Sequence, residues 1–267
     1  MKKWWRWVRI VIIVYCLVGI VLYYLQDYIL FHPAQISKAT AYRFNVPHKE
    51  VNIPYSANST INVVQFLVPD STIKGVVLYF HGNKKNIAWY AKFAPYFTKN
   101  RYEVWMIDYP GFGKSTGVFS EDRLYDWALT LYKLARAYYS PDSIIIYGKS
   151  MGTGIAAQLA SIRDCRHLIL ETPYYDMPSI IDNYLPIYPV NRMIHYKLPT
   201  WRYLQNVTAP VSIFHGTDDW IIPYRNANRL KRFLKATDVF ITVPGGSHND
   251  LFKFRLITEK LDSSLNF

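Results

Sequence analysis

Short apolar runs recur from residue 75 onward with helix-like segments between them, and this alternation constrains the fold more than any other feature. The runs occupy residues 75–80, 102–108, 143–147, 167–170, 211–214 and 239–243. Each has the length of a β-strand and few polar positions, so both of its faces are expected to be buried. Strands of this kind belong to a sheet that is covered by helices on both sides.

The segments between these runs have helical spacing. In residues 120–139 the apolar side chains Leu124, Trp127, Ala128 and Leu131 recur at intervals of three and four, and Ser120 is placed to cap the start. Further helices are expected over 151–161, 224–234 and 250–261, and two strands over 50–68 around a turn at 56–59. The sequence therefore predicts one α/β domain over 32–267, built on a doubly wound, mostly parallel sheet.

One segment interrupts the alternation. Residues 173–207 hold five prolines, six tyrosines and one tryptophan. This stretch is longer than a plain crossover needs, and its composition argues against disorder. We expect a short inserted cap over one end of the sheet, with aromatic side chains that either line a pocket or pack the cap internally.

The N-terminal end predicts a membrane anchor. Residues 10–26 carry no charge, Arg9 can extend its charge toward the interface, and tryptophans and tyrosines flank the run. We expect a single transmembrane helix over 8–26 after a basic tail, 1–7; the alternatives are a buried core helix and a signal peptide, although no small-residue cleavage site follows. The excess of basic residues before the helix predicts a cytoplasmic N-terminus and an extracytoplasmic domain.

Charge and cysteine content exclude several classes of protein. The net charge is +12, but the basic residues of the domain are scattered and no groove-reading motif accompanies them. Attraction to an anionic membrane surface is the favoured use of this charge, and no nucleic-acid partner is expected. Cys16 lies in the predicted span and Cys165 in the domain, so no disulfide is predicted. The chain has no HExxH or CxxC motif, so no metal is expected.

The strongest chemical signal is Gly148-Lys149-Ser150-Met151-Gly152, which fits the G-x-S-x-G pattern of a nucleophile elbow. A buried strand precedes it and a small-residue helix follows it, which is the context that this motif requires. A serine becomes nucleophilic when a histidine accepts its proton and a carboxylate orients the histidine. An aspartate pair, Asp218-Asp219, and then His248 follow in that order, each after a strand, where ligands bind in open α/β sheets.

With these residues the chain resembles the α/β-hydrolase superfamily, and in particular its membrane-anchored, serine-aminopeptidase-like branch. The resemblance covers roughly residues 28–260 and rests on six motifs in the family's order, which are YILFHP, FHGNKKN, IDYPGFGKSTG, GKSMGTG, HGTDDWIIP and GGSH. The chain departs from the family at Lys84 and Lys85, where small residues are common. These two ammonium groups either favour an anionic substrate or are simply solvated, and we expect the latter.

The resemblance implies a role for each candidate residue. Ser150 would be the nucleophile and His248 the general base. Asp219 matches the family's HGxxDxxxP pattern better than Asp218 and would orient the imidazole. The backbone N–H groups of Met151 and Asn83 would form the oxyanion hole. No cofactor is implied.

These features predict a membrane-anchored serine hydrolase that cleaves ester or thioester bonds of lipid-like acyl substrates. A serine aminopeptidase or amidase is the main alternative, and it would require carboxylates near the substrate amine, for which the cap offers only Asp176 and Asp182. A third interpretation, an inactive hydrolase fold used for binding, is disfavoured because all three triad candidates are present.

Overall fold

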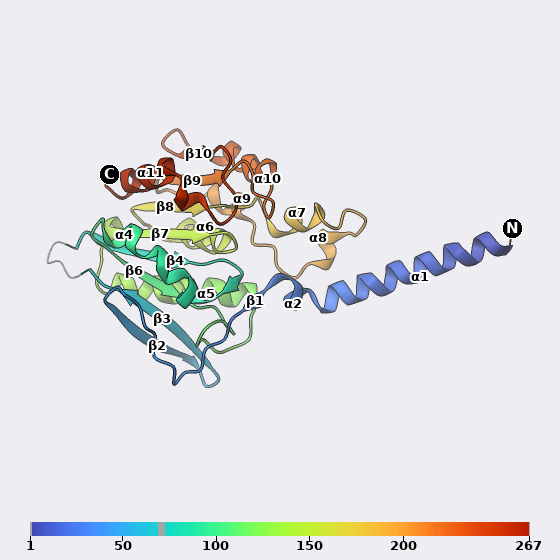
Figure 1. Cartoon of the computed structure of the whole chain (residues 1–267), viewed down its shortest axis with the longest axis horizontal. Coiled ribbons are helices and arrows are strands. Elements are labelled where there is room, and N and C mark those ends of the chain that lie inside the picture. Colours follow the sequence, from blue (N-terminus) through green and yellow to red (C-terminus); the bar gives the residue numbers. More distant parts are fainter. Residues whose placement is uncertain (1, 69–72, 267) are drawn as a thin grey trace.

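An eight-stranded sheet forms the centre of the domain in the computed structural model, which describes residues 2–68 and 73–266 (Figure 1). The strand order is β10-β9-β8-β7-β4-β6-β3-β2, and only the pairs formed by β3 are antiparallel. The strands are β2 (His48–Ser56), β3 (Ser59–Phe66), β4 (Gly75–Phe80), β6 (Tyr102–Ile107), β7 (Ile144–Lys149), β8 (His167–Glu171), β9 (Val211–Gly216) and β10 (Val239–Val243). The predicted doubly wound, mostly parallel sheet is confirmed.

The two faces of the sheet bury separate cores, because successive side chains of a strand point to opposite sides. In β4, Val76, Leu78 and Phe80 join one core, while Val77 and Tyr79 join the other. Helices α5 (Glu121–Arg136) and α6 (Gly152–Ile162) cover the first face. The second is covered by α3 (Ile87–Tyr90), η1 (Ala91–Phe93), α4 (Pro95–Thr98), η4 (Leu251–Lys253) and α11 (Arg255–Leu265).

Several helix boundaries differ from the prediction. Ser120 caps α5, as expected, by accepting a hydrogen bond from the Arg123 N–H at 3.2 Å. The segment 224–234 is α-helical only in α10 (Tyr224–Asn228) and continues as the 3₁₀ helix η3 (Arg229–Phe233). The segment 250–261 is likewise interrupted, at Phe254. The short helices of 87–98 were not predicted, although their buried side chains recur at helical spacing.

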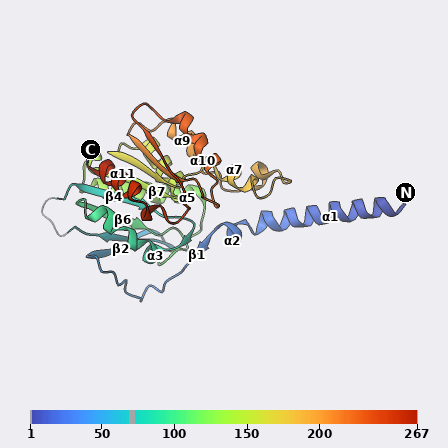
Figure 2. The same cartoon turned by 45° about the horizontal axis from the view of Figure 1, so that its top comes forward.

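The cap segment 173–207 folds into three short helices, α7 (Met177–Asp182), α8 (Val190–Met193) and α9 (Thr200–Leu204). Figures 1 and 2 show α7 projecting beyond the carboxyl ends of the strands, toward the N-terminal helix. Helix α9 instead packs on α6. The cap is therefore ordered: α9 packs on the body of the domain, whereas α7 projects away from it.

The N-terminal segment forms α1 (Lys2–Tyr24), then α2 (Gln26–Leu30). The helix extends away from the domain, and the most apolar 18-residue window within residues 3–24 has a mean hydropathy of 2.2 and no buried share. It is long and apolar enough to cross a bilayer. Strand β1 (His32–Pro33) then pairs with β5 (Lys84–Lys85), so the chain leaving α2 runs directly to the loop after β4.

Candidate active site

Ser150 follows β7 at the point where the sheet reverses its winding. Strand β4 has β6 on one side and β7 on the other, so the loops after β4 and β7 lie side by side, where open α/β sheets bind ligands. The Ser150 backbone is left-handed, with φ of +52°, and its N–H donates a hydrogen bond to the Glu171 carbonyl at 2.9 Å. A Cβ on Gly152 would lie 2.1 Å from the Phe80 carbonyl oxygen, so this glycine permits the sharp turn.

Three of the predicted side chains form one hydrogen-bonded chain. His248 Nε2 lies 3.0 Å from Ser150 Oγ, and His248 Nδ1 lies 2.8 Å from Asp219 Oδ2. The side chains come from the ends of β7, β9 and β10 and are buried, at 8%, 7% and 4% exposure for Ser150, His248 and Asp219. Asp218, the neighbouring carboxylate, is exposed and accepts a hydrogen bond from Thr217. The carboxylate that contacts the imidazole is therefore that of Asp219.

The environment of Asp219 keeps its carboxyl group ionised. Burial by itself would raise its pKa, but hydrogen bonding and attraction from His248 and the Ile222 N–H more than offset this, so the pKa is lowered. Its second oxygen, Oδ1, accepts hydrogen bonds from the N–H groups of Ile221 and Ile222 at 2.9 and 2.8 Å. His215 also lies nearby, and burial lowers its pKa. A carboxylate fixed in this way holds the imidazole in one orientation.

The two residues predicted for the oxyanion hole both border the same cavity as Ser150. In the described part of the chain, the backbone N–H groups of Met151 and Asn83 have no hydrogen-bond acceptor. The Asn83 side chain donates to the Leu30 carbonyl at 2.5 Å, and the Asn83 carbonyl accepts from the His32 N–H at 2.9 Å. The segment after α2 thus fixes the loop that carries Asn83.

A buried histidine–aspartate pair supports this loop from beneath. Asp108 Oδ1 accepts a hydrogen bond from the Ile87 N–H at 2.9 Å and lies 3.2 Å from His81 Nε2. The Tyr109 hydroxyl donates to the His81 carbonyl at 2.8 Å. A Cβ on Gly113 would lie 1.8 Å from Asp108 Oδ2. His81 and Asp108 therefore hold this loop and its neighbouring turn in place.

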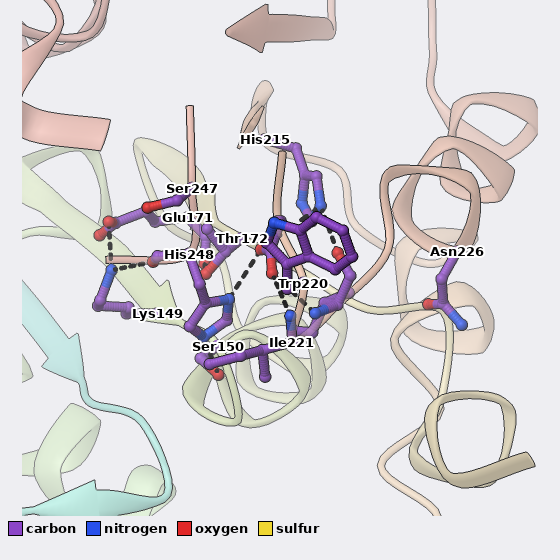
Figure 3. Close-up of polar contacts among 12 residues, drawn as sticks. Lys149, Ser150, Glu171, Thr172, His215, Trp220, Ile221, Asn226, Ser247 and His248 are labelled. Carbon is purple, nitrogen blue, oxygen red and sulfur yellow. Dashed lines mark hydrogen bonds and ion pairs between the residues drawn. The ribbon is translucent and has the colours of Figure 1, made fainter. Parts of the chain in front are cut away.

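Lys149, at the variable position of the elbow, is buried. Its side chain forms an ion pair with Glu171, its cross-strand neighbour in the β7–β8 register, and both residues are 1% exposed. Its Nζ also donates to the His248 carbonyl at 3.3 Å (Figure 3). The Tyr147 hydroxyl donates to Glu171 as well. Lys149 therefore has a structural role and does not face solvent. Lys84 and Lys85, in contrast, are exposed.

A cavity of about 440 Å³ opens above Ser150, within the size range of small-molecule sites. Its walls come from α2, the loop after β4, the cap and the segment after β9, and they are mostly apolar. The side chains contributed by α2 and the cap are Ile29, Leu30, Tyr174, Met177, Ile180, Ile181 and Tyr184.

The cap aromatics are divided between the two roles that the sequence left open. Tyr174 and Tyr184 line the cavity, whereas Tyr175 stacks on Trp201 and Tyr196 packs on Phe31. Within residues 2–68 and 73–266, no cluster of three or more histidine, cysteine, aspartate or glutamate side chains is arranged to hold a metal ion.

The sequence is similar to one family model and to several known proteins. The family model described as serine aminopeptidase, S33, matches residues 71–203. The chain is 29% identical over 191 residues to alpha/beta hydrolase domain-containing protein 17C of Xenopus tropicalis, covering 69% of this chain and 59% of that protein. It is 23% identical over 220 residues to the uncharacterized protein YfhR of Escherichia coli, covering 78% and 77%.

The solved structures extend this similarity to the fold. An esterase from Pyrococcus furiosus superposes with a TM-score of 0.68 at 14% identity, over 89% of this chain and 97% of that one. Est1E of Butyrivibrio proteoclasticus, determined with ferulic acid bound, superposes with a TM-score of 0.60 at 17% identity, over 77% and 94%. Sequence motifs, strand order and these similarities agree that the chain is a member of the α/β-hydrolase superfamily.

Proposed function

We propose that the protein is a membrane-anchored serine hydrolase that cleaves carboxylic ester or thioester bonds of lipid-like acyl substrates. The observation that carries this proposal is the buried hydrogen-bonded chain Ser150–His248–Asp219 at the floor of an apolar cavity. Nucleophile, base and orienting acid are within the distances that acyl transfer requires. The family similarity supports hydrolysis, and the apolar wall supports an acyl substrate.

In the proposed reaction, Ser150 Oγ attacks the acyl carbonyl carbon while His248 Nε2 accepts the hydroxyl proton. The carbonyl oxygen becomes an oxyanion that the N–H groups of Met151 and Asn83 stabilise, at about 3–4 kcal/mol for a donor of this kind. His248 then protonates the leaving alkoxide or thiolate, and the C–O or C–S bond breaks. Water, deprotonated by His248, cleaves the acyl-enzyme and regenerates Ser150. Asp219 stabilises the imidazolium in both halves of the reaction.

The aminopeptidase alternative has less support from the residues around the cavity. Recognition of a substrate α-amine requires a carboxylate close to the nucleophile. Asp176 accepts a hydrogen bond from the Ser179 N–H at 2.8 Å and caps α7, and Asp182 is exposed at the end of that helix. Neither side chain borders the cavity described above. The ester hypothesis is therefore favoured.

A substrate panel separates the two hypotheses. We expect the purified full-length chain in detergent to react with a fluorophosphonate probe and to hydrolyse p-nitrophenyl acyl esters, with a preference for chains long enough to fill the apolar cavity. Aminoacyl arylamides should be hydrolysed at least about 100-fold more slowly. Turnover of the arylamides alone would move the peptidase hypothesis to first place, and a folded protein that does not react with the probe would support a binding role.

Membrane anchoring by α1 is tested by replacing apolar side chains on the exposed surface of the helix. We expect the full chain to remain with membranes through alkaline carbonate extraction. Val14→Arg combined with Val18→Arg should release most of it, because each central arginine costs about 2.5–3.5 kcal/mol of insertion free energy. Tyr138→Arg, at a 72% exposed position on the domain, is the control and should not change extraction. Release of the wild-type chain would exclude a transmembrane anchor.

A further inference from the structure

Residues 183–195 of the cap, which we call the cap edge, are packed against the N-terminal helix. Tyr188 stacks on Tyr15 with ring centroids 4.5 Å apart and planes 3° from parallel. The Tyr15 hydroxyl donates to the Ile187 carbonyl at 2.8 Å, and the Tyr188 hydroxyl donates to the Tyr15 carbonyl at 3.1 Å. Gly19 provides the space, because a Cβ there would lie 3.1 Å from the Tyr188 ring. Helix and cap thus form a specific contact, which is made by residues between α7 and α8.

Gln26 provides a second attachment at the junction of α1 and α2. Its side chain is 7% exposed, although it lies at the end of the apolar run. Its Oε1 accepts a hydrogen bond from the His195 N–H at 2.7 Å, and its Nε2 donates to the Met193 carbonyl at 3.3 Å. The amide oxygen is thus paired with the cap backbone, and the amide nitrogen donates both to the cap and, at 2.6 Å, to the Tyr23 carbonyl of α1. The cap edge is therefore held along the helix from Tyr15 to Gln26.

This contact sets the depth of the cap edge in the membrane. Tyr15 lies in α1 and Gln26 begins α2, eleven positions later; at about 1.5 Å per residue this corresponds to about 16 Å, or roughly half of a hydrocarbon core about 30 Å thick. Residues 183–191 of the cap carry no charge, and Ile187 and Tyr184 are 71% and 59% exposed. If α1 spans the bilayer, the cap edge lies within the leaflet that holds the C-terminal half of this helix.

An apolar groove runs between this cap edge and the helices, and we call it the cap–helix groove. It is small, about 60 Å³. It shares Ile29, Leu30 and Ile181 with the wall of the cavity above Ser150. Its other lining residues are Leu22, Gln26, Leu185, Tyr188, Val190, Met193 and Ile194. The groove thus adjoins the cavity, with these three side chains forming their common wall, and its other end lies against Leu22 of α1.

We propose that the cap–helix groove binds the acyl chain of a lipid that resides in the same leaflet, and that this substrate reaches Ser150 sideways from the bilayer, between α2 and the cap. The inference rests on the proposed function, and it adds the source and path of the substrate. A chain in the groove has protein on one side and lipid on the other, so it stays in apolar surroundings while its ester or thioester group moves to the cavity. The exposed apolar side chains of the cap edge are explained in the same way.

Immersion of the cap edge is measured without any assay of activity. In a Cys16→Ser background, Ile187→Cys carrying a nitrobenzoxadiazole label is reconstituted in phosphatidylcholine vesicles with or without doxyl-labelled acyl chains. We expect doxyl lipid to quench this label at least about threefold more than a label at Tyr138→Cys, at the opposite end of the sheet. Equal quenching of the two labels, with thermal unfolding unchanged, would overturn immersion of the cap.

Acyl binding in the groove is measured by the ratio of kcat/KM for a sixteen-carbon ester to that for a two-carbon ester. Leu185→Trp, which fills the groove away from Ser150, should lower this ratio at least about tenfold. Burial of only about two methylene groups, at about 0.8 kcal/mol each, is enough to change an affinity tenfold. Tyr138→Trp should leave the ratio unchanged. Turnover of both esters by Leu185→Trp with the wild-type ratio would refute the groove while the proposed function stands. Absence of turnover in the folded wild-type chain would refute the proposed function itself.

Discussion

Replacing Ser150 with alanine is expected to lower kcat for ester hydrolysis by about 10⁴- to 10⁶-fold, the range found when a triad nucleophile is removed. The reaction cannot pass through an acyl-enzyme without this hydroxyl, and the hydrogen bond to His248 Nε2 is lost with it. The remaining turnover would come from binding and from the oxyanion donors alone. Stopped-flow measurement of p-nitrophenolate release, together with loss of probe labelling, measures the effect.

The same substitution should leave the fold intact. Alanine and serine are comparably strained at φ of +52°, and the Ser150 backbone bonds to Glu171 and Thr153 do not involve its side chain. Ser161→Ala, on the helix that follows, is the matched control and should retain wild-type turnover. Hydrolysis by Ser150→Ala at the wild-type rate would show that another group is the nucleophile.

Replacing Lys149 with methionine is expected to destabilise the protein by about 3–5 kcal/mol, because it leaves the Glu171 carboxylate buried without its cation. Both partners are 1% exposed, so water cannot replace the lost partner. Lys99→Met is the matched control, since it breaks an ion pair with Asp262 whose side chains are 47% and 37% exposed. Such surface pairs contribute about 1 kcal/mol or less. Urea unfolding of the full chain in detergent measures both changes.

The double variant Lys149→Met/Glu171→Gln separates stability from positioning. With no net charge left buried, most of the lost stability should return, and the glutamine can still accept from Tyr147. The hydrogen bond from Lys149 to the His248 carbonyl is still absent, so we expect kcat to stay at least about fivefold below wild type while the free energy of unfolding recovers. Full recovery of kcat in the double variant would show that Lys149 has no part in placing His248.

The predictions from sequence agree best with the structure where the signal is local. The apolar run 75–80 is β4 residue for residue, because a segment apolar on both faces is stable only inside a covered sheet. The elbow around Ser150 was recognisable because glycines on either side are required wherever strand and helix approach so closely. His248 and an aspartate after β9 could be assigned to the site because they follow Ser150 in the expected order and lie after the ends of strands. Their distances from Ser150 are a property of the folded sheet.

Helix type was less predictable where it depends on packing. The periodicity of 224–234 does not reveal that α10 gives way to 3₁₀ geometry at Arg229, nor does that of 250–261 reveal the break at Phe254. Apolar spacing at 87–98 did contain a usable signal for the short helices on the second face. Each of these segments is short, so its conformation is set by the surface it covers more than by its own propensity.

The sequence by itself determined the class of fold, the order of the strands along the chain and the residue types available for acyl transfer, because hydrophobic period and turn chemistry act over a few neighbouring residues. Only the tertiary structure decided that Lys149 is buried against Glu171, which follows from the β7–β8 register. Likewise, only folding brought Tyr15 and Gln26 against the cap and placed the cap–helix groove beside the cavity above Ser150. The contacts of Tyr15 and Gln26 with the cap join residues more than 160 positions apart, and no local pattern in the chain encodes which distant surface a side chain meets.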